Sequence, residues 1–269
     1  MTRPAITARG EWPPGVAYFR LGAGAHTVLF PGLSGTPDLP SGADMWMQRQ
    51  LLAPLARDRE LIWMNRRKDL VPPTTIGRIA QDGADAIRAQ LSPPVDVIGV
   101  STGGSVALQL AVDHPELVRR LVVVASAHRL SEEGRRVQRE LAAAVRAGRP
   151  RRAGAAGIGA MAAGSWGAAV FGAVGWLMGR GVFGRSGPDL LAVVDAEDTF
   201  DVGDRLGEIT APTLIVGAER DRYYSAELFR RTAEGIPHSQ LVLYPRTGHL
   251  GTTLSRRYYR DVRSFLDAA

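Results

Sequence analysis

Apolar runs as long as a β-strand alternate along the chain with segments whose apolar residues recur every three or four positions. Residues 121–125 are all apolar, which is typical of a strand covered on both faces. Ile76, Ile79, Gly83 and Ile87 share one face of a predicted helix. The predicted strands are residues 15–20, 27–30, 61–65, 95–100, 121–125, 213–217 and 241–244. This alternation indicates an α/β fold, with a mostly parallel central sheet and helices on both faces.

The alternation is interrupted once, between the predicted strand ending at Ala125 and the one starting at Thr213. About eighty residues separate these strands, far more than a single crossover connection needs. Their sequence is first rich in arginine with a helical pattern, then rich in Gly and Ala, and finally acidic. We therefore predict that residues 129–206 form an inserted helical cap, and that residues 1–128 and 207–269 form the core.

Composition narrows the class of protein. A chain of 269 residues with 45% hydrophobic and 22% charged residues is long enough to bury a large core, and we expect a globular protein. The absence of cysteine excludes a disulfide framework, thiolate metal sites and a cysteine nucleophile. The net charge of +6 would suit a nucleic-acid partner, but most arginines are interleaved with acidic residues. We therefore expect no nucleic-acid partner.

Residues 154–179 contain no charged residue, and the stretch is long enough to be compared with a membrane span. Gly and Ala dominate it, however, and contribute little free energy of transfer into lipid. We therefore predict small-residue helices over a pocket, without stable membrane insertion, and a lid that touches a membrane surface is the alternative. Residues 1–5 lack the apolar run of a secretory signal, and a cytoplasmic location is expected.

The first candidate for chemistry is Ser101, which lies between the apolar strand 95–100 and an apolar helix that begins near residue 105. Gly99 and Gly103 lie two residues before and two residues after it. A sharp strand-to-helix turn crowds the backbone, and glycine at these two positions relieves that crowding. The pattern predicts that Ser101 is a nucleophile presented at the N-terminus of a helix, where negative charge is favoured.

A serine nucleophile needs a general base within hydrogen-bond distance. Of the five histidines, His249 lies just past the carboxyl end of the last predicted strand. Ligands of open α/β sheets bind outside these carboxyl ends, so we predict that His249 is the base. His128 follows the strand 121–125 at the start of the cap, and we expect it to contribute to the substrate pocket.

The base in turn needs a carboxylate that orients its imidazole. Asp221 lies just beyond the carboxyl end of the strand 213–217, and Glu219 is the alternative two residues closer to the strand. The other suitable position, residues 126–128, contains no carboxylate. We therefore predict Asp221 as the third catalytic residue, in the chain order Ser, Asp, His.

Acyl transfer also needs donors for a developing oxyanion. We predict the backbone amides of Thr102, directly after the nucleophile, and of Leu33, in the turn after the strand 27–30. Gly32 in that turn and the cap residues Trp166 and Trp176 are predicted to bind substrate. The chemistry implies neither a metal nor an organic cofactor.

Together these motifs resemble the α/β-hydrolase superfamily, specifically the capped group that includes carboxylesterases, C–C bond hydrolases and cofactor-free perhydrolases. The resemblance extends over essentially the whole chain, including residues 211–217 before the acid and the pair Gly248-His249. It implies an α/β-hydrolase fold with a helical cap. The sequence departs from the family in the oxyanion loop, where Pro31-Gly32 replaces the common His-Gly, and Pro31 has no side-chain hydrogen bond to offer.

The sequence thus predicts a serine hydrolase that cleaves a carboxylic ester or related acyl compound through an acyl-enzyme on Ser101. The apolar cap indicates a small, apolar substrate. The same triad would serve a C–C bond hydrolase, a lactonase or an acyltransferase. A ligand-binding homologue without catalysis is a further alternative.

Overall fold

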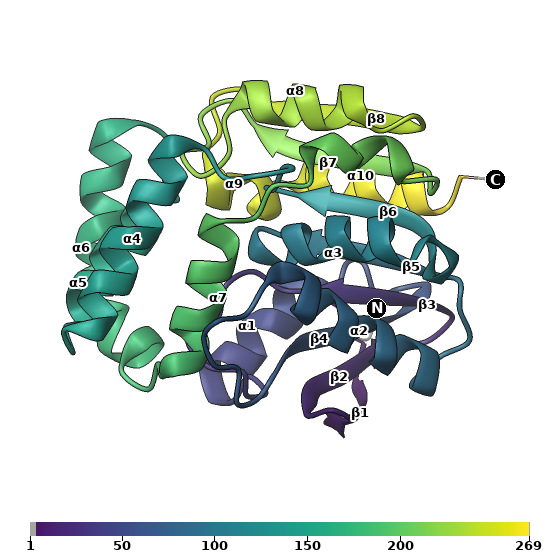
Figure 1. Cartoon of the computed structure of the whole chain (residues 1–269), viewed down its shortest axis with the longest axis horizontal. Helices are drawn as coiled ribbons and strands as arrows, with labels where there is room; N and C mark the ends of the chain where they lie inside the picture. The colour runs from purple at the N-terminus through teal and green to yellow at the C-terminus, as the bar shows by residue number, and fades with distance from the viewer. Residues whose placement is uncertain (1–3, 269) are drawn as a thin grey trace.

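The computed structural model describes residues 4–268 and contains one eight-stranded sheet, in the order β1-β2-β4-β3-β5-β6-β7-β8 (Figure 1). The first two neighbour pairs, β1 with β2 and β2 with β4, are antiparallel, and every later pair is parallel. The strands are β1 (Ile6–Trp12), β2 (Val16–Gly22), β3 (Ala25–Phe30), β4 (Arg59–Arg67), β5 (Val95–Val100), β6 (Val118–Val124), β7 (Thr213–Ala218) and β8 (Ser239–Tyr244). The prediction of a mostly parallel α/β sheet is confirmed.

Helices cover both faces of this sheet. One apolar core lies under α2, α3 and α8, and the other lies under α1 and α10. The α-helices are α1 (Gly42–Leu52), α2 (Ile76–Gln90), α3 (Thr102–Asp113), α4 (Glu132–Arg146), α5 (Pro150–Gly159), α6 (Gly164–Phe183), α7 (Pro188–Asp198), α8 (Ala226–Gly235), α9 (His249–Leu254) and α10 (Arg256–Leu266). Buried apolar runs explain the central strands, because residues 121–124 of β6 are fully enclosed between the two cores.

Strand β1 was not predicted from the sequence. Its residues alternate between half-buried and exposed, and polar Arg9 and Glu11 lie on this edge strand. An edge strand needs only one paired neighbour and one partly covered face, so it carries no long apolar run.

The interruption between β6 and β7 contains helices α4 to α7, as predicted for an inserted helical cap. Its two ends leave the core side by side: Arg129 bridges to Asp201, and the Val202 amide donates to the His128 carbonyl at 3.1 Å. In Figure 1 the first three of these helices lie outermost, and α7 lies between them and the core. The division at residues 128/129 and 206/207 stays a prediction.

The Gly- and Ala-rich stretch forms α5 and most of α6, which pack against each other through small residues. A Cβ added to Gly175 would lie 2.2 Å from the carbonyl oxygen of Gly154, so the two backbones approach as closely as glycine allows. Among the described residues, no helix is long and apolar enough to cross a membrane. The charge-free sequence therefore serves helix packing within the cap.

Candidate active site

Ser101 occupies the sharp turn between β5 and α3. Its backbone lies at φ +52° and ψ −123°, a strained conformation for a residue with a side chain. A Cβ at Gly99 would lie 2.3 Å from the Gly103 carbonyl oxygen, and a Cβ at Gly103 would lie 2.1 Å from the Phe30 carbonyl oxygen. Glycine at both positions is therefore what allows β3, β5 and α3 to meet around Ser101, and the serine hydroxyl stays partly exposed.

His249 and Asp221 lie next to Ser101 at the carboxyl ends of β8 and β7. The His249 Nε2 atom is 2.9 Å from the Ser101 Oγ, and its Nδ1 atom is 2.7 Å from the Asp221 Oδ2. In a neutral imidazole, an Nδ1–H that donates to Asp221 leaves Nε2 free to accept from the serine hydroxyl. The imidazole is buried, so these two hydrogen bonds and its ring contacts fix its orientation.

The Asp221 carboxylate is held from its other side. Its Oδ1 accepts hydrogen bonds from the backbone amides of Tyr223, at 2.8 Å, and Tyr224, at 3.1 Å. Both tyrosine rings pack against the His249 ring, with centroids 4.9 Å and 6.1 Å away. The residues 221–224 thus form a rigid turn that orients both the carboxylate and the imidazole.

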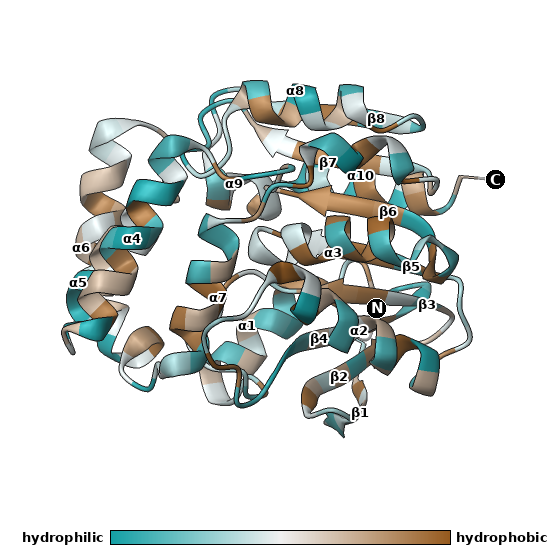
Figure 2. Cartoon of the chain, in the orientation of Figure 1, coloured by the Kyte–Doolittle hydropathy of each residue, from teal (hydrophilic) through white to brown (hydrophobic). Residues whose placement is uncertain are grey.

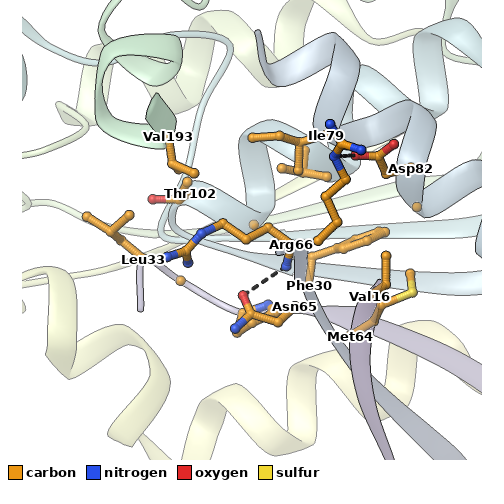
Figure 3. Close-up of a pocket in the computed structure, with 16 residues that line it drawn as sticks. Val16, Phe30, Leu33, Met64, Asn65, Arg66, Ile79, Asp82, Thr102 and Val193 are labelled. Carbon is orange, nitrogen blue, oxygen red and sulfur yellow. Dashed lines mark hydrogen bonds and ion pairs between the residues drawn. The ribbon is translucent and has the colours of Figure 1, made fainter. Parts of the chain in front are cut away.

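The turn after β3 lies directly beside Ser101. A Cβ at Gly32 would lie 3.4 Å from the Ser101 Cβ, which brings the backbone of Gly32 and Leu33 close to the serine. Thr102, the residue after Ser101, is the first residue of α3. Gly32, Leu33 and Thr102 also line one pocket, which is shown in Figure 3.

That pocket is lined chiefly by apolar side chains, and in Figure 3 the polar Asn65 and Arg66 lie together while Asp82 lies apart from them. Its apolar lining comes from Val16, Phe30, Leu33, Met64, Ile79, Val106 and Val193, and its polar lining comes chiefly from Asn65, Arg66, Arg67 and Asp82. Small-molecule sites are usually clefts with an apolar wall and a few placed polar groups. Ser101, Asp221 and His249 do not line this pocket, which adjoins Ser101 through Gly32 and Thr102.

The family model described as the Alpha/beta hydrolase family matches residues 12–259, most of the chain. The chain belongs to the α/β-hydrolase family. It is therefore a hydrolase, and the predicted fold and enzyme class are confirmed.

Individual relatives agree with this family. A protein of Variovorax paradoxus (strain S110) with the provisional name carbamate hydrolase RutD is 28% identical over 251 residues, 91% of each chain. A pimeloyl-(acyl-carrier protein) methyl ester esterase of Neisseria meningitidis serogroup A is 50% identical over 50 residues, which span 19% of this chain and only 16% of the esterase. The solved α/β hydrolase MGS-M2, from a Medee basin deep-sea metagenome library, has the same fold (TM-score 0.78, 15% identity, 97% of this chain and 98% of that one).

In this hydrolase, hydrogen bonds from residues other than Pro31 hold the loop that contains Leu33. The Ser34 hydroxyl donates to the Thr36 carbonyl at 2.8 Å, and the Asn65 amide donates to Ser34 Oγ and to the Thr36 carbonyl, both at 3.2 Å. The Arg66 Nη1 donates to the Ser34 carbonyl at 3.1 Å and to its hydroxyl at 2.9 Å. Asn65 and Arg66 at the end of β4 thus anchor the loop that Pro31 cannot anchor.

Arg66 also joins this loop to the cap. Its Nη2 and Nε donate to the Asp189 carboxylate at 2.5 Å and 3.2 Å, and Figure 3 shows the guanidinium beside Leu33. Burial lowers the pKa of Arg66, and the charge of Asp189 opposes this shift. Because Arg66 is buried and Asp189 is half-buried, removing either partner would leave a poorly solvated charge without its counterion.

A second cap carboxylate, Glu197, reaches the turn of Ser101 itself. It is fully buried at the end of α7 and accepts four hydrogen bonds: from the hydroxyls of Thr102 (2.8 Å), Ser105 (3.2 Å) and Tyr224 (2.8 Å), and from the Gln138 amide (2.8 Å). No lysine or arginine of residues 4–268 pairs with it. Burial, and then the charge of Glu197, raise the pKa of Tyr224, so this phenol stays protonated and donates.

The remaining predicted substrate-binding residues lie elsewhere. His128 is buried against α8, with its Nδ1 2.9 Å from the Thr232 hydroxyl. Trp166 is 83% exposed and Trp176 is 43% exposed, with the Arg151 guanidinium over its ring. None of the three lines the pocket beside Ser101.

Sequence reasoning missed Arg66 and Glu197. Arg66 follows a predicted strand at its carboxyl end, which was a usable signal. Glu197 had no such signal, because its partners come from distant segments. Residues 4–268 contain no cluster of three or more acidic or histidine side chains that could hold a metal.

Proposed function

We propose that this hydrolase cleaves a carboxylic ester, or a related acyl compound, of a small apolar substrate through an acyl-enzyme on Ser101. The observation that carries the proposal is the continuous pair of hydrogen bonds from Asp221 through His249 to the Ser101 hydroxyl, of 2.7 Å and 2.9 Å. This arrangement supplies a nucleophile, a base and the group that orients the base.

In the proposed reaction His249 Nε2 accepts the proton of Ser101 Oγ as the oxygen attacks the acyl carbon. Asp221 stabilises the resulting imidazolium, and the tetrahedral intermediate collapses when His249 returns the proton to the leaving alcohol. Water, deprotonated by the same imidazole, then attacks the acyl-enzyme and releases the acid. In each half-reaction His249 acts first as a base and then as an acid, so no further titratable group is needed.

The amides of Leu33 and Thr102 are the proposed donors to the oxyanion. The N-terminus of α3 adds a favourable dipole for negative charge at this point. The Asn65 and Arg66 hydrogen bonds support the Leu33 side, and they provide the anchoring that Pro31 lacks. We therefore expect an oxyanion site of ordinary efficiency despite the departure at position 31.

The apolar wall of the pocket in Figure 3 favours an uncharged acyl or alcohol group. The name of the Neisseria relative, a methyl ester esterase, agrees with ester cleavage, and the other reactions that this triad could perform stay alternatives. Cleavage of a C–C bond, opening of a lactone and acyl transfer to another acceptor would all begin with the same attack by Ser101.

Labelling with a fluorophosphonate probe tests the proposal. We expect labelling of the wild type and none of Ser101→Ala or His249→Ala, whereas Ser126→Ala, a buried serine outside the triad, should label normally. Asp221→Asn should lower kcat on a short-chain ester by about 10⁴-fold, because the imidazole loses its orientation and charge partner. A wild type that does not react with the probe would contradict the proposal.

A further inference from the structure

The outer face of α6 is the most apolar exposed surface of the described chain. Seven of the eleven exposed large apolar side chains of residues 4–268 lie on this one helix. They are Trp166, Val170, Val174, Trp176, Leu177, Met178 and Val182. Soluble monomers rarely expose contiguous apolar surface of this kind, so we expect this face to bind a partner.

The opposite side of α6 is already occupied. Its buried glycines, Gly175 and Gly179, pack on α5, and Phe183 packs into the cap core. Figures 1 and 2 show α6 at the outer margin of the cap, with pale to brown, apolar colouring along its length. Six of these side chains are thus exposed on the side of α6 that α5 leaves free, and the seventh, Trp176, lies under the Arg151 guanidinium of α5.

The free charge near this face is positive. Residues 141–188 contain six arginines and no aspartate or glutamate. Arg146 and Arg185 pair with Asp195 and Asp38, whereas within residues 4–268 no carboxylate pairs with Arg149, Arg151, Arg152 or Arg180. Arg149, Arg151 and Arg152 are exposed at the start of α5, and Arg151 covers the Trp176 ring. A second copy would bring the same cations against one another, whereas an anionic surface would complement them.

We propose that the outer face of α6 docks onto an anionic lipid surface, with the helix lying in the interface plane. Its aromatic and aliphatic side chains would enter the acyl boundary, and the arginines would contact headgroup phosphates. This docking does not depend on the catalytic proposal.

The two ends of α6 lie beside the candidate site. The backbone of Ala163, just before the helix, would be 2.6 Å from a Cβ at Gly248, the neighbour of His249. At the other end, the Val182 carbonyl would be 2.0 Å from a Cβ at Gly35, two residues past Leu33. A lipid surface that binds α6 therefore lies near the site, which suits an apolar substrate.

Vesicle co-sedimentation tests this surface. We expect the wild type to bind vesicles of equal parts phosphatidylglycerol and phosphatidylcholine, to bind pure phosphatidylcholine vesicles weakly, and to dissociate as salt is added. Leu177→Asp, at a position 70% exposed, should abolish binding without loss of fold, while Val71→Asp, at a 64% exposed position away from α6, should bind as the wild type does. Arg149→Ala and Arg152→Ala should each weaken binding about fivefold.

Three results would each overturn the docking proposal. The first is a wild type that stays in the supernatant with anionic vesicles, and the second is a Leu177→Asp variant that binds them unchanged. The third is a dimer in sedimentation velocity that Leu177→Asp converts to monomer, because the face would then bind a second copy of the chain.

A different observation, the buried carboxylate Glu197, carries a second inference. Its four partners are neutral donors, so hydrogen bonds alone hold this side chain at the N-terminus of α3. It bonds the side chain of Thr102, whose amide is a proposed oxyanion donor, and the phenol of Tyr224, which packs on His249. We infer that Glu197 is a positioning residue that fixes the Thr102 amide and couples the cap to the oxyanion site.

This second inference rests on the proposed function, and its test separates the two. Once the wild type has labelled with fluorophosphonate, Glu197→Gln should lower kcat and the labelling rate about a hundredfold with KM little changed. Thr102→Val, which keeps the amide, should cause a similar loss, and the double variant should be no worse than either single one.

Asp198→Asn, the neighbouring carboxylate of α7, serves as the matched control and should leave kcat unchanged. A Glu197→Gln variant with lower Tm but normal kcat would overturn the positioning role and leave the proposed function intact. A wild type that fails to label would count against the proposed function instead.

Discussion

Helices α6 and α7 follow each other in the same insert, yet the two are built for different surroundings. Helix α7 is an inner helix: Leu190, Val193 and Val194 are buried, and the carboxylates Asp189 and Glu197 near its two ends bond to the core. Helix α6 has one side packed on α5 through glycines and leaves its large apolar side chains exposed.

The difference shows that position in the chain does not decide what a cap helix does. The two carboxylates of α7 reach the two sides of the proposed oxyanion site, Asp189 through Arg66 and Ser34, and Glu197 through Thr102. No side chain of α6 lines the pocket beside Ser101. We infer that α7 positions residues beside Ser101, and that α6 binds a surface outside the molecule.

The largest expected effect is on the free energy of unfolding, when a valine of α7 and a valine of α6 are each replaced by aspartate. Val193→Asp would bury an unpaired carboxylate at a position 2% exposed, and should lower the free energy of unfolding by about 4 kcal/mol or more. Val174→Asp, at a position 42% exposed, should change it by no more than about 0.5 kcal/mol. Urea denaturation of the two variants measures both values, and equal losses would erase the distinction between the helices.

A matched pair of arginines gives the next largest effect. Arg66→Met would leave the half-buried Asp189 without its partner, and should lower the free energy of unfolding by about 3 kcal/mol. Arg151→Met, on the α5–α6 side, would lose only an exposed contact with the Trp176 ring, worth about 0.5 kcal/mol. Arg66→Met combined with Asp189→Asn should recover part of the loss; a double variant less stable than Arg66→Met would contradict the ion-pair explanation.

The smallest effect concerns His128, where the cap leaves the core. Burial lowers the pKa of His128 below its ordinary value of 6.5, and the charge of Asp201 opposes this shift only in part. The unfolded chain then binds the proton more readily, so the stabilisation is present above about pH 6.5 and is lost as the pH falls below it. At pH 5.5 the loss relative to His128→Asn should be no more than about 1.4 kcal/mol.

Unfolding free energies of the wild type and His128→Asn at pH 7.5 and pH 5.5 test this expectation. A wild type that gains stability relative to the variant on acidification would contradict the assigned direction. Activity at pH 7.5 should be similar in both, because His128 does not line the pocket.

The sequence predicted the central strands well because a strand covered on both faces needs an uninterrupted apolar run, as in β6 and β7. The edge strand β1 was not predicted because about half of its residues are polar and it has no apolar run. The expectation that Trp166 and Trp176 bind substrate rested on their apolar character alone. Composition cannot tell an inward face of a cap helix from an outward one, and here both tryptophans lie on the exposed side of α6.

By itself the sequence determined the sheet, the insert and the strand ends at which Ser101, Asp221 and His249 stand. The strands and the strand ends are each encoded within about ten neighbouring residues, by an apolar run, a glycine spacing or a turn, and the insert is encoded by the roughly eighty residues between two strands. Only the tertiary structure decided that Asn65 and Arg66 replace a missing anchor at Pro31, and that Glu197 meets Thr102 across 95 positions of the chain. Such contacts depend on how the helices of the cap pack on the core, and packing is a property of the whole fold and not of any local pattern.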